Sequence, residues 1–228
     1  MGRVDGGPAA LLGALQDALG PNATIVVPTQ TTQYSKSSAA HRAMLAGRAA
    51  AERRRLLRSI PGFDPARTPS TGMGVFAEYV RTHATACRSG HPTSSFAALG
   101  PAAEELTAVH PRTCHLGDDS PLGALARRDG QVLLLGVGFE KTTAFHLAEY
   151  RVAPRRRVYY SKMYPSTTWD PYVGTVLDAS DFAAIGAEMR EAAWVRTGTV
   201  AAAVSACFPL APAVDFAEQW MQRMRVLI

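Results

Sequence analysis

A histidine and a glutamate three positions apart are the first candidates for chemistry in this sequence. His146 and Glu149 lie in the segment KTTAFHLAE, which follows an apolar run and a Gly-Val-Gly turn. Residues with this spacing share one face of a helix. A carboxylate beside an imidazole can fix its tautomer and stabilise its protonated form, as a general base requires. An ordinary capped helix, in which a neighbour satisfies the histidine, is the alternative, and spacing alone favours it.

Two threonines, Thr142 and Thr143, precede this histidine. We expect them in the first turns of the helix that follows the glycine turn. Their hydroxyls, together with backbone N–H groups at the helix start, can hold an anion or a carbonyl oxygen.

A second candidate is the loop Arg88-Ser89-Gly90-His91-Pro92, followed closely by Ser94 and Ser95. Arginine presents a planar fork of donors that matches a phosphate or a carboxylate. Serine hydroxyls and loop amides add neutral donors. The alternative is a polar surface turn, and without other information that alternative is favoured.

Other catalytic motifs are missing from the sequence. The six histidines show neither HxxxH nor HxH spacing, and no CxxC pair accompanies the three cysteines, so we expect no metal. The segment GVGFEK lacks the third glycine of a dinucleotide fingerprint, and there is no phosphate-binding P-loop. A GxSxG nucleophile elbow is also missing.

Composition narrows the classes of partner. The chain has 228 residues, 47% hydrophobic and 19% charged, with a net charge of +5. Its two arginine runs, at 53–55 and 155–157, are not interleaved with aromatic residues, so we expect an anionic small molecule rather than nucleic acid. The three cysteines are odd in number and widely spaced, so they indicate no disulfide framework. This pattern is typical of a reducing compartment, and we expect a cytoplasmic protein. The sequence shows neither a secretory signal nor an apolar run of membrane-spanning length, so no membrane partner is expected.

Alternating apolar segments predict a single α/β domain over residues 1–228. Helices are predicted over 9–19, 39–58, 72–82, 101–109, 122–127, 181–192 and 214–226. Strands are predicted over 23–28, 94–100, 132–136 and 157–161, with the first and third of them buried, and a long strand of small residues is predicted at 198–208, within 195–208. Loops at the carboxyl ends of such strands, here 29–38 among them, are where open α/β sheets usually hold ligands.

Several of these segments, taken in order, resemble the aminoglycoside 3-N-acetyltransferase (antibiotic acetyltransferase) family. The most specific are CRSGHPTSSFAALGPAAEELT at 87–107 and VLLLGVGFEKTTAFHLAE at 132–149. They are accompanied by VDGGPAALLGAL, TIVVPT, FDPARTPSTGMGVFAEYVR and GDDSPLGAL, which lie at 4–15, 24–29, 63–81 and 117–125. The resemblance is good from Val4 to Glu149 and weaker beyond.

The resemblance implies transfer of an acetyl group from acetyl-CoA to an amine of an aminoglycoside or related amino sugar. It implies an α/β fold with a mixed central sheet flanked by helices, unlike the GNAT acetyltransferases. His146 would be the general base, oriented by Glu149, and transfer would be direct, without an acyl-enzyme. The remaining expected site residues are those near the cofactor (Arg88, Ser89, His91, Ser94, Ser95, Thr142 and Thr143) and those for the polycationic acceptor (Asp64, Asp118 and Asp170).

The chain also departs from the family pattern. It starts at MGRVDGG, where a later stretch of the family would fall, so the family's first strand is expected to be missing. Lys141 replaces a small polar residue before the threonines. Two alternatives therefore stay open: the same transfer to a biosynthetic amine, and a degenerate acyl-CoA-binding member without turnover. The sequence determines neither the acceptor nor the oligomeric state.

Overall fold

The structure is a computed structural model that describes residues 4–152 and 155–225. Its backbone contacts divide the chain into two compact units. Unit 1 comprises Met1–Gly7, Leu116–Arg155 and Thr175–Ile228, and unit 2 comprises Pro8–His115 and Arg156–Gly174. Each unit is thus built from segments far apart in the sequence.

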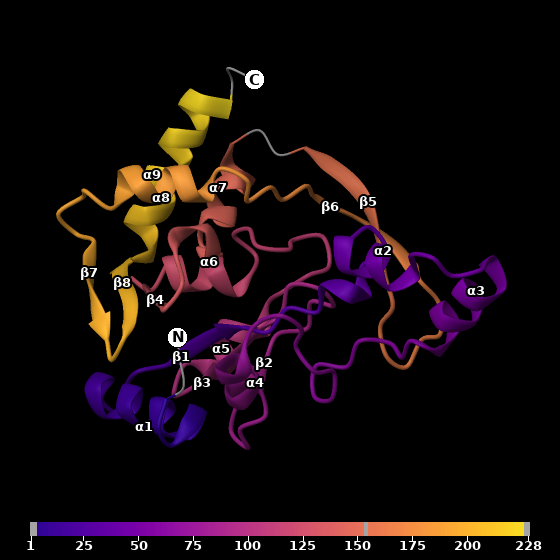
Figure 1. The fold of residues 1–228 in the computed structure, drawn as a ribbon, viewed down its shortest axis with the longest axis horizontal. Helices are drawn as coiled ribbons and strands as arrows, with labels where there is room; N and C mark the ends of the chain where they lie inside the picture. The colour runs from indigo at the N-terminus through magenta and orange to yellow at the C-terminus, as the bar shows by residue number, and fades with distance from the viewer. Residues whose placement is uncertain (1–3, 153–154, 226–228) are drawn as a thin grey trace. The chain divides into compact units, whose positions relative to one another are not determined.

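Unit 2 holds most of the N-terminal elements (Figure 1). Its helices are α1 (Gly7–Leu19, whose first residue belongs to unit 1), the 3₁₀ turn η1 (Thr32–Tyr34), α2 (Ala39–Leu45), α3 (Ala50–Ser59), α4 (Val75–Arg81) and α5 (Ala103–Ala108). Its strands are β1 (Ile25–Pro28), β2 (Cys87–Arg88), β3 (Phe96–Leu99), β5 (Arg156–Ser161) and β6 (Asp170–Thr175, whose last residue belongs to unit 1).

A three-stranded antiparallel sheet in the order β1-β3-β2 forms the centre of unit 2. Its middle strand β3 is buried along its whole length because α4 and α5 pack on it and because its residues are apolar. The register pairs Val27 with Ala97 and Arg88 with the same Ala97 on the other side. Arg88, the last residue of β2, therefore lies at the same level of the sheet as Val27, close to the end of β1.

Unit 1 combines four helices with a second antiparallel sheet among its described residues. The elements are α6 (Pro121–Ala126), β4 (Gln131–Leu135), η2 (Phe139–Lys141), α7 (Phe145–Arg151), α8 (Phe182–Met189), β7 (Arg196–Val200), β8 (Ala203–Pro209) and α9 (Leu210–Met224). The sheet order is β4-β8-β7. Helix α7 packs against α9, and α8 packs against η2 and α9. Fully buried Phe145, Leu147 and Ile185 lie in this part of the core.

The predicted α/β class is confirmed, and the described strands pair in small antiparallel sheets. The predicted long strand at 198–208 is wrong, because the chain turns at residues 201 and 202 and forms the hairpin β7–β8, visible in Figure 1. Ala201 adopts a positive φ of 52° there. Glycine or asparagine is the usual residue in such a turn, so the sequence carries no hairpin signal.

Two further expectations need correction. The helix predicted over 39–58 is interrupted between α2 and α3, where Gly47 has a φ of 71° that no helix accommodates. The burial expected for strand β4 is wrong, because Leu134 alone is buried there and Leu133 is 45% exposed. The predicted closing helix corresponds to α9, and its predicted last residue, Val226, lies outside the described residues.

Candidate active site

His146 and Glu149, both in α7 of unit 1, contact each other as their spacing predicts. The Nδ1–H of His146 donates to Oε2 of Glu149 across 2.5 Å. This hydrogen bond assigns the proton of the neutral ring to Nδ1, which leaves Nε2 as the atom that can accept a proton. The side chain of Glu149 is only 3% exposed, whereas that of His146 retains 15%.

The second carboxylate oxygen of Glu149 is held from two other parts of unit 1. Oε1 accepts a hydrogen bond from the backbone N–H of Asp178 at 3.0 Å. It also accepts one from Nη1 of Arg225 at 2.8 Å. Oε2 of Glu149 therefore faces the histidine, whereas Oε1 faces a backbone amide and a guanidinium.

Arg225, which caps the C-terminus of α9, is itself fixed by a second carboxylate. Its Nε and Nη2 donate to the two oxygens of Asp181 at 2.7 and 2.8 Å, and Nη2 also donates to the carbonyl of Asp178 at 2.9 Å. Hydrogen bonding to Asp181 is the main cause that raises the pKa of Arg225 above its usual value, with Glu149 adding to it against the opposing effect of burial. The guanidinium is therefore a permanent cation between two carboxylates.

The imidazole of His146 packs on the ring of Phe182, the first residue of α8. The ring centroids are 4.7 Å apart with an interplanar angle of 58°, and Phe145 meets Phe182 edge-on. This apolar wall restricts the orientation of the histidine. Nε2 has no hydrogen-bond partner among residues 4–152 and 155–225, so it is available to a ligand.

The turn before α7 differs from the expected anion-binding helix start. The backbone N–H groups of Phe145, His146 and Leu147 donate to the carbonyls of Thr142, Thr143 and Ala144 at 3.0–3.1 Å. They are therefore not available to an anion. Thr142 is fully buried, and its hydroxyl lacks a partner in the described part of the chain. The predicted cofactor role of Thr142 and Thr143 stays a prediction.

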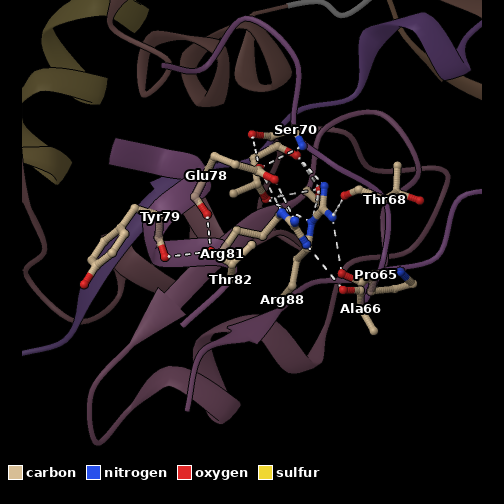
Figure 2. Close-up of polar contacts among 11 residues, drawn as sticks. Pro65, Ala66, Thr68, Ser70, Glu78, Tyr79, Arg81, Thr82 and Arg88 are labelled. Atoms are coloured by element: carbon tan, nitrogen blue, oxygen red, sulfur yellow. Dashed lines mark hydrogen bonds and ion pairs between the residues drawn. The ribbon is translucent and has the colours of Figure 1, made fainter. Parts of the chain in front are cut away.

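Arg88 lies in unit 2, at the end of β2, and Figure 2 shows its guanidinium directed at the loop that carries Pro65 and Thr68. The guanidinium stacks over the ring of Phe63 at 5.0 Å. It donates to the hydroxyls of Thr29 and Ser95 (both 3.1 Å) and to the carbonyls of Thr29 (2.7 Å), Pro65 (3.2 Å) and Thr68. Burial lowers the pKa of Arg88 to about 10, which leaves it charged at neutral pH. Its donors are largely used within the protein.

The other residues of this loop also face inward. Ser89 is fully buried, accepts from the N–H of Phe96 at 2.9 Å and donates to Nδ1 of His110 at 2.8 Å. His91 is fully buried, and its Nδ1 accepts from the N–H of Ser94 at 3.0 Å. Burial lowers the pKa of His91 well below its usual range and that of His110 to about 4. Direct contacts of Ser89, His91, Ser94 and Ser95 with a cofactor stay predictions.

The three predicted acceptor-binding aspartates fall into different units. Asp64 and Asp170 belong to unit 2 and Asp118 to unit 1. Asp64 accepts from the N–H of Ala66 at 2.9 Å, and Asp170 accepts from the Thr168 hydroxyl at 2.8 Å. Asp118 is 65% exposed and lies 3.7 Å from Arg151. Each has a local partner, and their role with an acceptor stays a prediction.

Sequence reasoning missed Arg225, Asp178 and Asp181. The sequence marks Asp181 only as the start of a helix. An arginine in the last turn of a helix usually interacts with the helix dipole, so its type and position give no reason to select it. It lies 76 positions after Glu149 in the sequence, and only folding brings the two together.

Metal-binding clusters and membrane-spanning helices do not occur among residues 4–152 and 155–225. In these residues, histidine, cysteine, aspartate and glutamate side chains form no group of three or more suited to a metal ion. No helix in that part of the chain is long and apolar enough to cross a membrane.

Comparisons with known proteins agree on one family. The family model for aminoglycoside 3-N-acetyltransferase matches residues 1–222. The Bacillus subtilis SPbeta prophage-derived aminoglycoside N(3′)-acetyltransferase-like protein YokD is 33% identical over 96% of this chain and 81% of its own length. The crystal structure of YokD superposes with a TM-score of 0.90, covering 99% of this chain and 84% of that one.

Two other proteins give similar matches. Aminoglycoside N(3)-acetyltransferase VII of Streptomyces paromomycinus is 34% identical over 97% of this chain and 82% of its own length. A structure of AAC-IIIb in a binary complex with CoASH has a TM-score of 0.80 at 29% identity, covering 97% of this chain and 85% of that one. The matches extend over nearly the whole sequence and include both units, and on this evidence the chain belongs to the aminoglycoside 3-N-acetyltransferase family.

Proposed function

We propose that this protein transfers the acetyl group of acetyl-CoA directly to an amine of an aminoglycoside, with His146 as the general base. The hydrogen bond between His146 and Glu149 carries the proposal, because it leaves Nε2 free on a partly exposed ring. The acceptor class is supported by the name of the Streptomyces paromomycinus relative, and the acetyl donor by the CoASH complex of AAC-IIIb.

His146 would act on the acceptor amine. An ammonium has no lone pair, so Nε2 must take a proton before or during attack on the thioester. The nitrogen–carbon bond of the amide then forms and the carbon–sulfur bond breaks. The amide nitrogen carries two fewer protons than the ammonium, so one further proton leaves to bulk solvent. The proton held on the imidazole is available to the departing thiolate. Glu149 stabilises the imidazolium and keeps Nε2 pointed outward, as the acidic member of a catalytic triad does.

The other site residues take secondary roles in this proposal. Thr142, whose buried hydroxyl lacks a partner among residues 4–152 and 155–225 and lies four residues before His146, is the best-supported cofactor contact of unit 1. Arg88, Ser89, His91 and the two serines at 94 and 95 would support the cofactor by shaping their loop, since their polar atoms already bond within unit 2.

An acidic cluster is the best candidate for holding the acceptor. The guanidinium of Arg151 lies 3.7, 3.1 and 3.6 Å from the carboxylates of Asp118, Asp215 and Glu218. A second guanidinium, that of Arg127, donates to the backbone carbonyl of Asp118 at 3.0 Å. Three carboxylates against these two guanidiniums leave one excess negative charge, which suits an ammonium group of a polycation. Asp64 and Asp170 remain further candidates in unit 2.

The test is thiol release from acetyl-CoA with and without a panel of 2-deoxystreptamine aminoglycosides. Acceptor-dependent release establishes the transfer, and His146→Asn should lower kcat by about 10²- to 10⁴-fold. The control is His83→Asn, which changes a histidine of unit 2 that is remote in sequence from His146, and it should leave kcat unchanged. Near-normal turnover in His146→Asn would remove the histidine from the mechanism.

Two alternatives are separated by the same measurement. Release with a biosynthetic amine but with no antibiotic would assign the same chemistry to another acceptor. Binding of acetyl-CoA, measured by calorimetry, without release in any mixture would assign a non-catalytic acyl-CoA-binding role.

A further inference from the structure

Arg225 and Glu149 make an ion pair that joins the C-terminal end of α9 to the proposed base. The guanidinium of Arg225 makes four hydrogen bonds within unit 1. Two go to the oxygens of Asp181, one to the carbonyl of Asp178 and one to Oε1 of Glu149. The bidentate contact with Asp181 fixes the plane of the guanidinium, and the fixed plane determines where Nη1 meets Glu149.

The contacts of Glu149 show what this geometry achieves. An unrestrained carboxylate can rotate and exchange the positions of its two oxygens. The imidazole of a histidine hydrogen-bonded to it would then change its orientation as well. Here Oε1 is held by two donors, Arg225 and the Asp178 amide, so Oε2 alone faces His146. Glu149 is 3% exposed, and water therefore offers little competition for either oxygen.

Charge balance supports the same conclusion. Glu149 and Asp181 bring two negative charges into contact with the guanidinium of Arg225, which carries one positive charge. When His146 takes a proton during turnover, the four side chains become electrically neutral. Without Arg225, Glu149 would keep its backbone donor and His146 but would lose its ion pair with a guanidinium.

We infer that Arg225 is a positioning residue of the acetyl transfer: oriented by Asp181, it locks Glu149 so that His146 keeps its proton on Nδ1 and presents Nε2 to the acceptor. The inference rests on the proposed function of His146. It assigns a role in the reaction to the last described residue of the chain, 76 positions after Glu149.

The experiment compares Arg225→Met, Arg225→Lys and Asp181→Asn with the wild-type protein and with Arg223→Met. Arg223 is an exposed arginine of the same helix and serves as the matched control. Arg225→Met should lower kcat by about 10²-fold, as misplacement of a catalytic group by about 1 Å does, with KM for acetyl-CoA changed less than about twofold. The kcat values of Arg225→Lys and Asp181→Asn should lie between those of Arg225→Met and the wild type. The ammonium in Arg225→Lys cannot make the planar fork contact, and the amide in Asp181→Asn cannot accept both hydrogen bonds from Arg225.

A rescue experiment separates positioning from simple damage to the fold. Guanidinium ion added at low millimolar concentration to Arg225→Ala should restore part of kcat, and it should not change the activity of Arg223→Met. Thermal unfolding of each variant identifies any that fail to fold. If Arg225→Met or Arg225→Ala fails, Arg225→Lys takes its place, because it retains the charge and most of the side-chain volume.

The ¹⁵N chemical shifts of the His146 ring provide a readout that needs no substrate. The wild-type protein should show one neutral tautomer, protonated on Nδ1, whereas Arg225→Met should show a mixture. Absence of acceptor-dependent thiol release in the wild type would defeat the proposed function, and the tautomer measurement would still decide the locking role. Wild-type kcat together with an unchanged tautomer in folded Arg225→Met would overturn the inference.

Discussion

Oε2 of Glu149 accepts the Nδ1–H of His146 at 2.5 Å, and this contact lies within one turn of α7. The pair itself is local, since helical spacing brings the two side chains together. Its environment is not local, because Glu149 is buried beneath residues from the 178–181 segment and from α9. The chemistry of the site therefore depends on how unit 1 folds around one helix.

Replacing Glu149 by glutamine tests the contribution of this carboxylate. We expect kcat to fall by about 10²- to 10⁴-fold, because an amide neither fixes the tautomer nor stabilises the imidazolium as a carboxylate does. The melting temperature should also fall, since Arg225 loses one of its two carboxylate partners. Steady-state kinetics and thermal unfolding measure the two effects. Glu140→Gln, an exposed change in the same unit, should alter neither, and equal effects in both variants would contradict the assignment.

Replacing Arg88 by methionine tests whether its role is structural. We expect a loss of about 3 kcal/mol or more in the free energy of unfolding, because the carbonyls of Thr29, Pro65 and Thr68 would be left without this donor. Arg67→Met removes an arginine that is 81% exposed and should cost less than about 0.5 kcal/mol. Urea unfolding of both variants provides the comparison. A stable Arg88→Met protein that binds acetyl-CoA poorly would instead support the direct cofactor contact.

The buried histidines predict a stability that falls in acid. The folded pKa of His110 is about 4, against an ordinary value of 6.5, and that of His91 is shifted in the same direction. The unfolded chain therefore takes up protons first as the pH falls below 6.5, and stability decreases until about pH 4. His110 alone should account for about 3 kcal/mol over this window.

Urea unfolding at several pH values between about 7 and 4.5 measures this slope. His110→Gln should reduce it, whereas His83→Gln, which changes a histidine with partial exposure, should retain it. A free energy of unfolding that does not depend on pH in the wild type would show that the cluster does not control acid stability.

Two helical glycines should respond in opposite ways to alanine. At Gly13 in α1, an added Cβ would meet nothing within 4 Å, so Gly13→Ala should stabilise the protein by about 0.5–1 kcal/mol through helix propensity. At Gly186 in α8, the added Cβ would lie 2.0 Å from Cβ of Phe139. Overpacking should then cost about 1–3 kcal/mol despite the better propensity. Thermal unfolding of both variants tests the contrast, and stabilisation at both positions would refute the close packing of α8 on η2.

The sequence by itself determined the features that depend on neighbouring residues. Apolar periodicity placed most helices and strands, and a spacing of three brought His146 to Glu149. The order of the motifs along the chain was enough to indicate the family. These predictions succeeded because helix geometry fixes which side chains meet within one or two turns.

Only the tertiary structure decided what surrounds that pair. Arg225 comes to Glu149 from another helix, and the inward orientation of Ser89 and His91 depends on burial in unit 2. No periodic pattern encodes such contacts, because they join residues far apart in the chain and are selected by packing of the whole unit. The hairpin at Ala201 was missed for the same reason: pairing of β7 with β8 imposes a backbone conformation that alanine seldom adopts by itself.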